Sequence, residues 1–301
     1  MVAQHGAGTQ ACPYNDTLFN IGVRVEQIGM IGVGAMGSAL LERLKIAGVE
    51  ATVYDIDPAA QEAARSQGAR VAKNTAEVTQ TSTIVDVVVR TDKEVLDCAT
   101  GSGGILDSAK PGTLIVLHST ILPQTTRKVA EVARERNVGV IDACMLGVPR
   151  AVRAGDLIFV VGGSNELVER ARPHLLNMAK KVIHMGSAGA GNTAKLIKNL
   201  TSGAETLMIH EALQLGESEG LRFPQVLEML QQVESEKLLA RWPRVFDPSS
   251  PKPTPHVGRN VFDKDVPLAG ELARLSGLDL PIIGQLAAAA KRLAKQKKEK
   301  S

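Results

Sequence analysis

Two glycine-rich turns carry the residues of this chain that are best placed to do chemistry. The first turn, GVGAMG, follows a short apolar run and opens a segment with helical periodicity. A helix N-terminus there presents N–H groups and a positive dipole end, which together bind the pyrophosphate of a dinucleotide. Gly32 permits the tight turn, Gly34 lets the backbone approach the pyrophosphate, and Gly37 allows the helix to pack closely on the strand. Against the alternative of an ordinary strand-to-helix turn, we predict a cofactor-binding turn made of Gly32, Gly34, Ala35, Met36 and Gly37.

The end of the next strand-like run indicates which dinucleotide would bind. Asp55, in VYDID, follows Gly32 by about 20 residues, the spacing at which an acidic side chain accepts hydrogen bonds from the adenosine ribose. Its carboxylate would repel a 2′-phosphate, and residues 55–58 contain no Arg or Lys to offset that charge. We therefore favour NAD over NADP. Asp57, before Pro58, is instead expected to cap a helix.

The second turn, GSAGAGNTAKLIKN at residues 186–199, places Lys195 and Asn199 four residues apart on one face of a predicted helix. The turn resembles a phosphate loop, but the first turn is better suited to phosphate. We expect its glycines to let the chain leave one domain and begin a long helix beside the cofactor. The alternative is that Lys195 simply reaches solvent from an amphipathic helix.

The elements around these turns indicate a sheet domain followed by a helical one. Apolar strand-like runs alternate with helical segments up to residue 186, which is typical of a parallel sheet covered on both faces. The strand-like runs are 25–32, 51–55, 81–89, 113–119, 138–144, 156–163 and 181–186. From about residue 190 to 219 the pattern is helical without a proline, and helices continue after it, apart from a proline-rich loop at 247–258.

The predicted fold class is therefore α/β, with an N-terminal doubly wound parallel (Rossmann) sheet domain and an all-α C-terminal domain joined to it by a long helix. The predicted limits are 1–24 for a disordered extension, 25–187 for the dinucleotide-binding domain and 188–301 for a helical substrate and oligomerisation domain.

Composition excludes several classes of protein. The chain has 301 residues, 44% of them hydrophobic, and no apolar run approaches the length of a membrane span, so we expect a cytoplasmic protein with no membrane partner. Its three cysteines are widely spaced and contain no CxxC, which indicates neither a disulfide framework nor a metal site. The net charge of +3 comes from the basic tail at 291–301, which is better explained as a solvated helix than as a nucleic-acid site.

Taken together, the motifs resemble those of the β-hydroxyacid dehydrogenases, the family that includes 3-hydroxyisobutyrate dehydrogenase and tartronate semialdehyde reductase and that belongs with 6-phosphogluconate dehydrogenase. The matching segments, in order, are GVGAMG, HST at 118–120, DAC-MLG at 142–147, GAGNTAKLIKN at 189–199 and FDKD at 262–265. The resemblance covers about residues 25–295. It implies hydride transfer between NAD and a small 3-hydroxy acid or its oxo form.

The resemblance also implies roles for individual residues. Lys195 matches the family's catalytic lysine and would be the general acid and base, provided that burial lowers its pKa from about 10.4. Asn199 would orient the substrate. Ser119 and Thr120 match a pair near the nicotinamide and substrate, although such residues also cap helices. Lys264, followed by Asp265, would reach the cofactor side of the cleft, unless the two form a simple surface pair.

The substrate loop departs from the family pattern. Where relatives read Asp-Ala-Pro-Val-Ser-Gly-Gly, residues 142–148 here read DACMLGV, so Leu146 replaces the serine that would donate to a carboxylate and only Gly147 keeps its type. Arg150 or Arg153 is a candidate for the missing donor, with a surface position as the alternative. Arg90 is another departure, and faces either the cleft or solvent. The substrate is therefore left open, and a bulkier or more apolar hydroxy acid than 3-hydroxyisobutyrate is one candidate.

Three other functions are alternatives. A dinucleotide-binding scaffold protein without activity would share the fold, an imine reductase would be a near relative, and a nucleic-acid binder would use the tail. The scaffold has no reason to keep Lys195 and Asn199 in this order, and imine reductases typically replace the lysine. By similarity to the family, we expect a homodimer or homotetramer formed through the helical domain.

Overall fold

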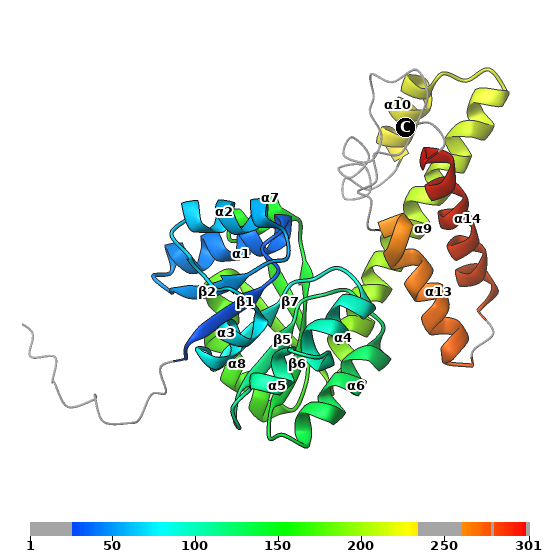
Figure 1. Ribbon diagram of the computed structural model, residues 1–301. Coiled ribbons are helices and arrows are strands. Elements are labelled where there is room, and N and C mark those ends of the chain that lie inside the picture. The colour runs from blue at the N-terminus through cyan, green and yellow to red at the C-terminus, as the bar shows by residue number, and fades with distance from the viewer. Residues whose placement is uncertain (1–25, 234–260, 278–279, 299–301) are drawn as a thin grey trace, which may run out of the picture.

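The computed structural model describes residues 26–233, 261–277 and 280–298 (Figure 1). The predicted extension at 1–24 and the proline-rich loop at 247–258 lie outside the described residues. A sheet domain and a group of helices are joined by one long helix, α9 (Ala190–Ser218), as Figure 1 shows.

The described strands form one eight-stranded sheet in the order β3-β2-β1-β4-β5-β6-β7-β8. Their bounds are Ile28–Ile31, Ala51–Tyr54, Arg70–Val71, Ile84–Val87, Leu114–Leu117, Gly139–Leu146, Ile158–Gly162 and Lys181–Gly186 for β1 to β8. The six strands β1 to β6 are parallel, as predicted. Strand order reverses at β1 and β4, which creates the crevice where open α/β sheets bind ligands.

The prediction of a parallel sheet is wrong at one pair, because β7 runs antiparallel to β6. The connection between them, residues 147–157, contains only the five-residue helix α7 (Pro149–Arg153). A parallel crossover needs a dozen or more residues, so this short connection returns the chain in the opposite direction. Strand β8 pairs parallel to β7 and thus shares its reversed direction.

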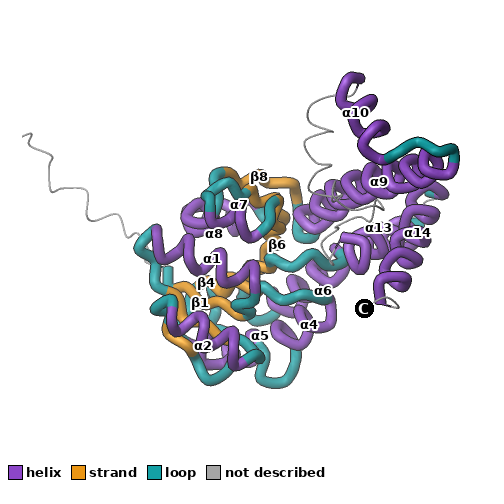
Figure 2. Tube along the Cα trace, turned by 90° about the horizontal axis from the view of Figure 1, so that it is seen from above, coloured by secondary structure: helices purple, strands orange, loops and turns teal. Residues whose placement is uncertain are grey.

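Helices cover both faces of the sheet, and strand residues alternate between the two layers. In β5, Leu114 and Val116 pack in one buried cluster, and Ile115 and Leu117 pack in the other. The first layer contains α1 (Ala35–Ile46), α2 (Pro58–Ser66), α7 and α8 (Asn165–Met178). The second layer contains α3 (Thr75–Gln80), α4 (Asp92–Thr100), α5 (Ile105–Ser108) and α6 (Pro123–Arg134). Figure 2 shows α1 and α8 on the opposite side of the strands from α4 and α6. The sequence patterns did not predict α3, α4, α5, α7 or β3.

Local capping follows the sequence rules in α1 and α2. The side chain of Asp57 accepts a hydrogen bond from Ala59 N at 2.9 Å, which confirms it as the cap of α2. Helix α1 ends at Ala47, and Gly48 follows with φ +73°, the left-handed geometry that favours glycine.

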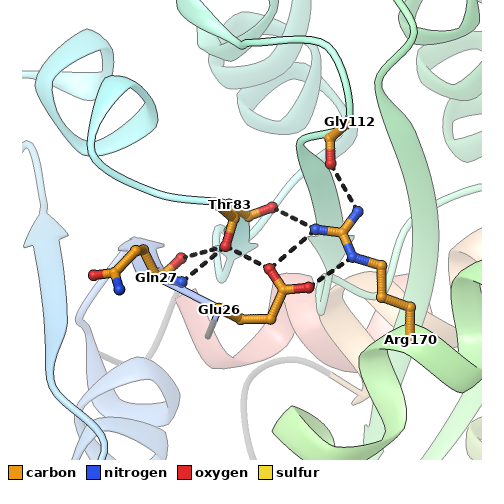
Figure 3. A network of polar contacts seen from close by, with 5 residues as sticks. All are labelled: Glu26, Gln27, Thr83, Gly112 and Arg170. Carbon is orange, nitrogen blue, oxygen red and sulfur yellow. Dashed lines mark hydrogen bonds and ion pairs between the residues drawn. The ribbon is translucent and has the colours of Figure 1, made fainter. Parts of the chain in front are cut away.

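The amino ends of three strands are tied to α8 by a polar network (Figure 3). Arg170 of α8 pairs with Glu26 through two nitrogens, at 2.8 and 3.1 Å, and donates to the carbonyl oxygens of Gly112 and Thr83. These partners precede β1, β5 and β4 respectively. The network therefore fixes the edge of the sheet opposite to the glycine turn and leaves the other edge open for ligands.

Beyond the sheet, the described helices pack on α9 and on one another. They are α10 (Phe223–Val233), the π-helix η1 (Val261–Asp265), α13 (Val266–Leu275) and α14 (Pro281–Lys298). A small core of Leu207, Val266 and Ala290 joins α9, α13 and α14. In Figure 1 this group stands beside the sheet domain, and α9 bridges the two.

Candidate active site

The glycine turn after β1 has the shape that a dinucleotide requires. Gly32 has φ +91°, and a Cβ on it would collide with the carbonyl of Val88. A Cβ on Gly37 would collide with the carbonyl of Gly32, so both positions require glycine. A Cβ on Gly34 would meet nothing within 4 Å, and no side chain caps the start of α1 there. The open position at Gly34 and the uncapped N–H groups, including those of the predicted Ala35 and Met36, fit a pyrophosphate.

Asp55 lies at the end of β2 with its carboxylate turned toward this turn. Its Oδ2 accepts from Val33 N at 2.7 Å, and its Oδ1 accepts from Asp57 N at 2.9 Å. The side chain is thereby held beside Gly34, where the ribose of a dinucleotide would follow its pyrophosphate. The residues present therefore fit a nicotinamide dinucleotide, and the group would supply a hydride acceptor or donor.

A buried carboxylate anchors the start of α9 to the sheet. Asp142, in β6, accepts from Gly189 N and from Asn192 N, each at 2.7 Å. The side chain of Asn192 accepts from Ile121 N at 2.9 Å and donates to Thr126 Oγ1 at 3.1 Å. Burial raises the pKa of Asp142 to about 6, against the opposing effect of the two backbone donors. Asp142 and Asn192 thus fix the position and rotation of the helix that carries Lys195.

Two glycines allow this close approach. A Cβ on Gly191 would lie 2.6 Å from Val160 O and 2.7 Å from Asp142 O, and one on Gly162 would lie 2.5 Å from Asp142 Oδ1. Real Cβ atoms do not approach other atoms so closely. The second glycine turn therefore serves to seat the start of α9 directly on β6 and β7.

Lys195 reaches the end of β6 from the second turn of α9. Its Nζ donates to Met145 O at 2.6 Å. Burial lowers the pKa of Lys195, and the nearby charge of Lys198 lowers it further. The lowered pKa that a lysine base requires is thus produced chiefly by desolvation.

Asn199 connects Lys195's helix to η1. Its Nδ2 donates to Asp265 Oδ2 at 2.7 Å, and its Oδ1 accepts from Lys198 Nζ at 3.3 Å. Lys264 lies 3.0 Å from the other oxygen of Asp265 and donates to Thr120 O at 2.5 Å. Lys264 therefore links the helical group to the loop after β5, which a simple surface pair would not do.

Ser119 and Thr120 lie just beyond β5, at the same edge of the sheet as the glycine turn. Ser119 is buried and donates to Val89 O at 2.6 Å. Neither residue caps α6, whose cap is Leu122 without a side-chain hydrogen bond. Cys144 is also buried, its Sγ donates to Ser119 O at 3.6 Å, and burial raises its pKa. A thiol held in its neutral form packs the site and is not a nucleophile.

Beneath Ser119 lies a buried ion cluster that sequence reasoning missed. Asp86 Oδ1 is 3.0 Å from His118 Nε2, and Asp86 Oδ2 is 2.8 Å from His174 Nε2. Burial raises the pKa of Asp86, but the two imidazoles outweigh that effect and hold it well below its usual range. His118 Nδ1 is 2.8 Å from Ala143 O, which can only accept. Through these contacts, His118 links Asp86 of β4 to the backbone of β6 just beyond the end of β5.

The substrate loop borders an open hollow of about 670 Å³. Leu146 and Gly147 line one side, and three residues of α9 line the other: Lys198, Thr201 and Ser202. Because Lys195 binds the carbonyl immediately before Leu146, the hollow lies next to the predicted catalytic lysine.

The structure does not bring an arginine into this hollow. Arg153 forms a two-nitrogen pair with Glu42 of α1, at 2.8 and 2.9 Å, and Arg150 is exposed on α7. Arg90 is exposed as well. The expectation that a guanidinium replaces the lost serine is therefore wrong for Arg153, whose surface pair explains it, and is unsupported for Arg150.

Comparisons with known proteins agree with this geometry. Residues 27–186 match the NAD binding domain of 6-phosphogluconate dehydrogenase, and residues 189–301 match the family described as NAD-binding of NADP-dependent 3-hydroxyisobutyrate dehydrogenase. The chain belongs to the 3-hydroxyisobutyrate dehydrogenase-like family. As a member of this family within the 6-phosphogluconate dehydrogenase superfamily, it is an NAD(P)-dependent oxidoreductase of the β-hydroxyacid dehydrogenase type.

Individual members of the 3-hydroxyisobutyrate dehydrogenase-like family differ in their substrates. The NAD-dependent L-serine dehydrogenase of Pseudomonas aeruginosa is 30% identical over 89% of this chain and 92% of that protein. The 2-(hydroxymethyl)glutarate dehydrogenase of Eubacterium barkeri is 35% identical, and the match spans 65% of each chain. The structure of a Mycobacterium tuberculosis 3-hydroxyisobutyrate dehydrogenase with L-serine has a TM-score of 0.79 and 28% identity, covering 90% of this chain and 94% of that one. Family membership therefore leaves the substrate open.

The described part of the chain contains no group of three or more His, Cys, Asp or Glu residues arranged to hold a metal ion. Among the helices that the structure describes, none has the length and apolar character needed to cross a membrane.

Proposed function

We propose that this protein oxidises a small 3-hydroxy acid with NAD, or reduces the corresponding oxo acid, with Lys195 as the general acid and base. The observation that carries the proposal is the partly buried Lys195 of α9, whose Nζ donates to Met145 O at the end of β6 and whose pKa is lowered chiefly by desolvation. A lysine with a lowered pKa loses its proton more readily, and in its neutral form it can accept the hydroxyl proton as the hydride leaves the carbinol carbon. In the reductive direction, its ammonium returns that proton to the new alkoxide.

The other residues would orient the reactants. Asn199, held by Asp265, would orient the substrate hydroxyl or carboxylate, with its amide oxygen accepting from the hydroxyl, and Ser119 and Thr120 would face the nicotinamide side. Gly32, Gly34 and Gly37 would hold the pyrophosphate. Holding the reactants in this orientation supplies much of the rate gain in such reactions.

NAD is the proposed cofactor because Asp55 would repel the 2′-phosphate of NADP. Its carboxylate is fixed beside the glycine turn by Val33 N and Asp57 N. We assign cofactor binding to residues 25–187, and substrate contacts and self-association to residues 188–301. The proposed assembly is a homodimer or homotetramer.

A scaffold protein without activity is the second candidate, since the fold alone does not establish turnover. The lowered pKa of Lys195 disfavours it, because desolvating a lysine is costly and a pure binder gains nothing from it.

The test is NADH formation by the purified full-length protein on a panel of 3-hydroxyisobutyrate, L-serine and 2-(hydroxymethyl)glutarate, with NADP in parallel. We expect turnover with at least one acid, a preference for NAD, and kcat/KM for oxidation that rises with pH to a plateau as Lys195 loses its proton. NAD binding without turnover of any acid would favour the scaffold instead.

A further inference from the structure

The hollow beside Lys195 is formed by two segments with different chemistry. Leu146, at the end of β6, is apolar and half-buried, and Gly147 adds backbone. Lys198, Thr201 and Ser202 lie three and four residues apart on α9 and therefore share one helix face.

Among these five lining residues, Lys198 alone carries a charge. The hydroxyl of Thr201 donates to Ile197 O, and that of Ser202 donates to Lys198 O, each at 3.0 Å. Since both hydroxyls already donate within the helix, the lysine ammonium is the side-chain group on this wall that is best suited to bind an anion.

Lys198 also lies beside the proposed reaction centre. Its Nζ is 3.3 Å from Asn199 Oδ1, and its charge contributes to lowering the pKa of Lys195, three residues earlier on the same helix. Side chains at that spacing are about 5–6 Å apart at Cβ. A substrate whose hydroxyl lies at Lys195 could therefore reach Lys198 with a side chain of a few carbon atoms.

We propose that Lys198 binds a second carboxylate on the substrate, and that the hollow holds the methylene chain between the two acid groups against Leu146. This inference rests on the proposed function and names its substrate class: 3-hydroxy acids that carry a distal carboxylate. Leu146, which stands where a serine donor was expected, is then the apolar wall for the methylene groups. An ammonium-to-carboxylate hydrogen bond supplies the attraction at the far end.

Two compounds form a matched pair for the test. 3-Hydroxyisobutyrate and 2-(hydroxymethyl)glutarate share the reacting hydroxymethyl group on the carbon next to the first carboxylate. In the second compound, a chain ending in a carboxylate replaces the methyl group. The ratio of kcat/KM for the two compounds therefore measures the effect of the distal carboxylate. Any effect of a mutation on the pKa of Lys195 cancels from this ratio, because both compounds react at that residue.

The experiment compares the wild type with Lys198→Met and Lys198→Arg. We expect the wild type to prefer the dicarboxylate, Lys198→Met to lower the ratio tenfold or more, and Lys198→Arg to keep it within about threefold, because hydrogen bonds to charged groups contribute at that level. A wild-type preference for 3-hydroxyisobutyrate, or an equal loss on both compounds in Lys198→Met, would overturn the inference while leaving the proposed function standing.

A binding measurement separates the two proposals further. Calorimetric titration of the NAD-saturated protein with glutarate and with butyrate requires no turnover. If the wild type binds glutarate more tightly than butyrate and Lys198→Met loses this difference, the distal site is supported, even if neither hydroxy acid reacts. The lack of any reaction would refute only the proposed function. Equal binding of the two acids by the wild type would refute the distal site.

Discussion

The close contact between α9 and the sheet predicts that Gly191→Ala damages catalysis at a distance. The new Cβ would lie 2.6 Å from Val160 O, 2.7 Å from Asp142 O and 2.9 Å from Asp142 Oδ2. None of these atoms ends a flexible side chain free to move aside, since two are backbone carbonyls and the third belongs to the buried anchor. Restoring a separation of about 3.4 Å from Val160 O requires the helix to retreat by about 0.8 Å.

Such a retreat moves Lys195, which lies one turn further along α9. A displacement of about 1 Å in a reacting group costs on the order of 100-fold in rate, so we expect kcat to fall by about 10- to 100-fold. Overpacking of this kind costs about 1–3 kcal/mol of unfolding free energy. The dissociation constant of NAD should stay within about twofold, because the glycine turn after β1 is not in contact with this helix start.

The assay combines steady-state kinetics on the best acid of the panel, NAD binding by fluorescence and urea denaturation. Gly284→Ala is the matched control: it lies in α14, and its Cβ would meet nothing within 4 Å. We expect the control to keep wild-type kcat and to gain about 0.5–1 kcal/mol in stability. A folded Gly191→Ala protein with wild-type kcat would refute the argument that the position of α9 sets that of Lys195.

Two further predictions concern buried or cofactor-facing carboxylates. Burial raises the pKa of Asp142 from 3.8 to about 6, so the folded state binds more protons than the unfolded state between these pH values, and this group should lower stability by about 2 kcal/mol as pH rises from 4 to 6. Asp142→Asn should remove that component in urea denaturation at several pH values, whereas a pH-independent difference from the wild type would contradict it. Asp55→Asn keeps the size of the side chain and removes its charge, so we expect the ratio of kcat/KM for NAD to that for NADP to fall about tenfold or more; an unchanged ratio would show that Asp55 does not select the cofactor.

Much of the fold could be predicted from local sequence patterns. The apolar runs of β4 and β5 and the unbroken helical pattern of α9 predicted these elements, because burial on both faces and the lack of proline leave strong signals. The reversal at β7 left no such signal, since its apolar residues suit a parallel and an antiparallel strand equally well. Short helices such as α5 have too few residues for periodicity to be recognised.

In the candidate site, too, some residues stand out in the sequence and others do not. The glycine turn, Asp55, Lys195 and Asn199 could be selected from sequence motifs, and their roles in cofactor binding and catalysis stay predictions. The anchors could not, because Asp142 bonds to residues 47 and 50 positions away and Asp86 bonds to a histidine 88 positions away. One signal was available for both: each aspartate interrupts an apolar strand, and a buried carboxylate there needs partners.

Lys195→Met tests whether Lys195 transfers the hydroxyl proton, because methionine keeps much of the side-chain length and cannot exchange a proton. We measure kcat with saturating NAD and the best hydroxy acid, and confirm NAD binding and folding in the same preparation. We expect a loss of about 100- to 10,000-fold in kcat with an unchanged dissociation constant for NAD. A folded, NAD-binding Lys195→Met protein that turns over at the wild-type rate would contradict it.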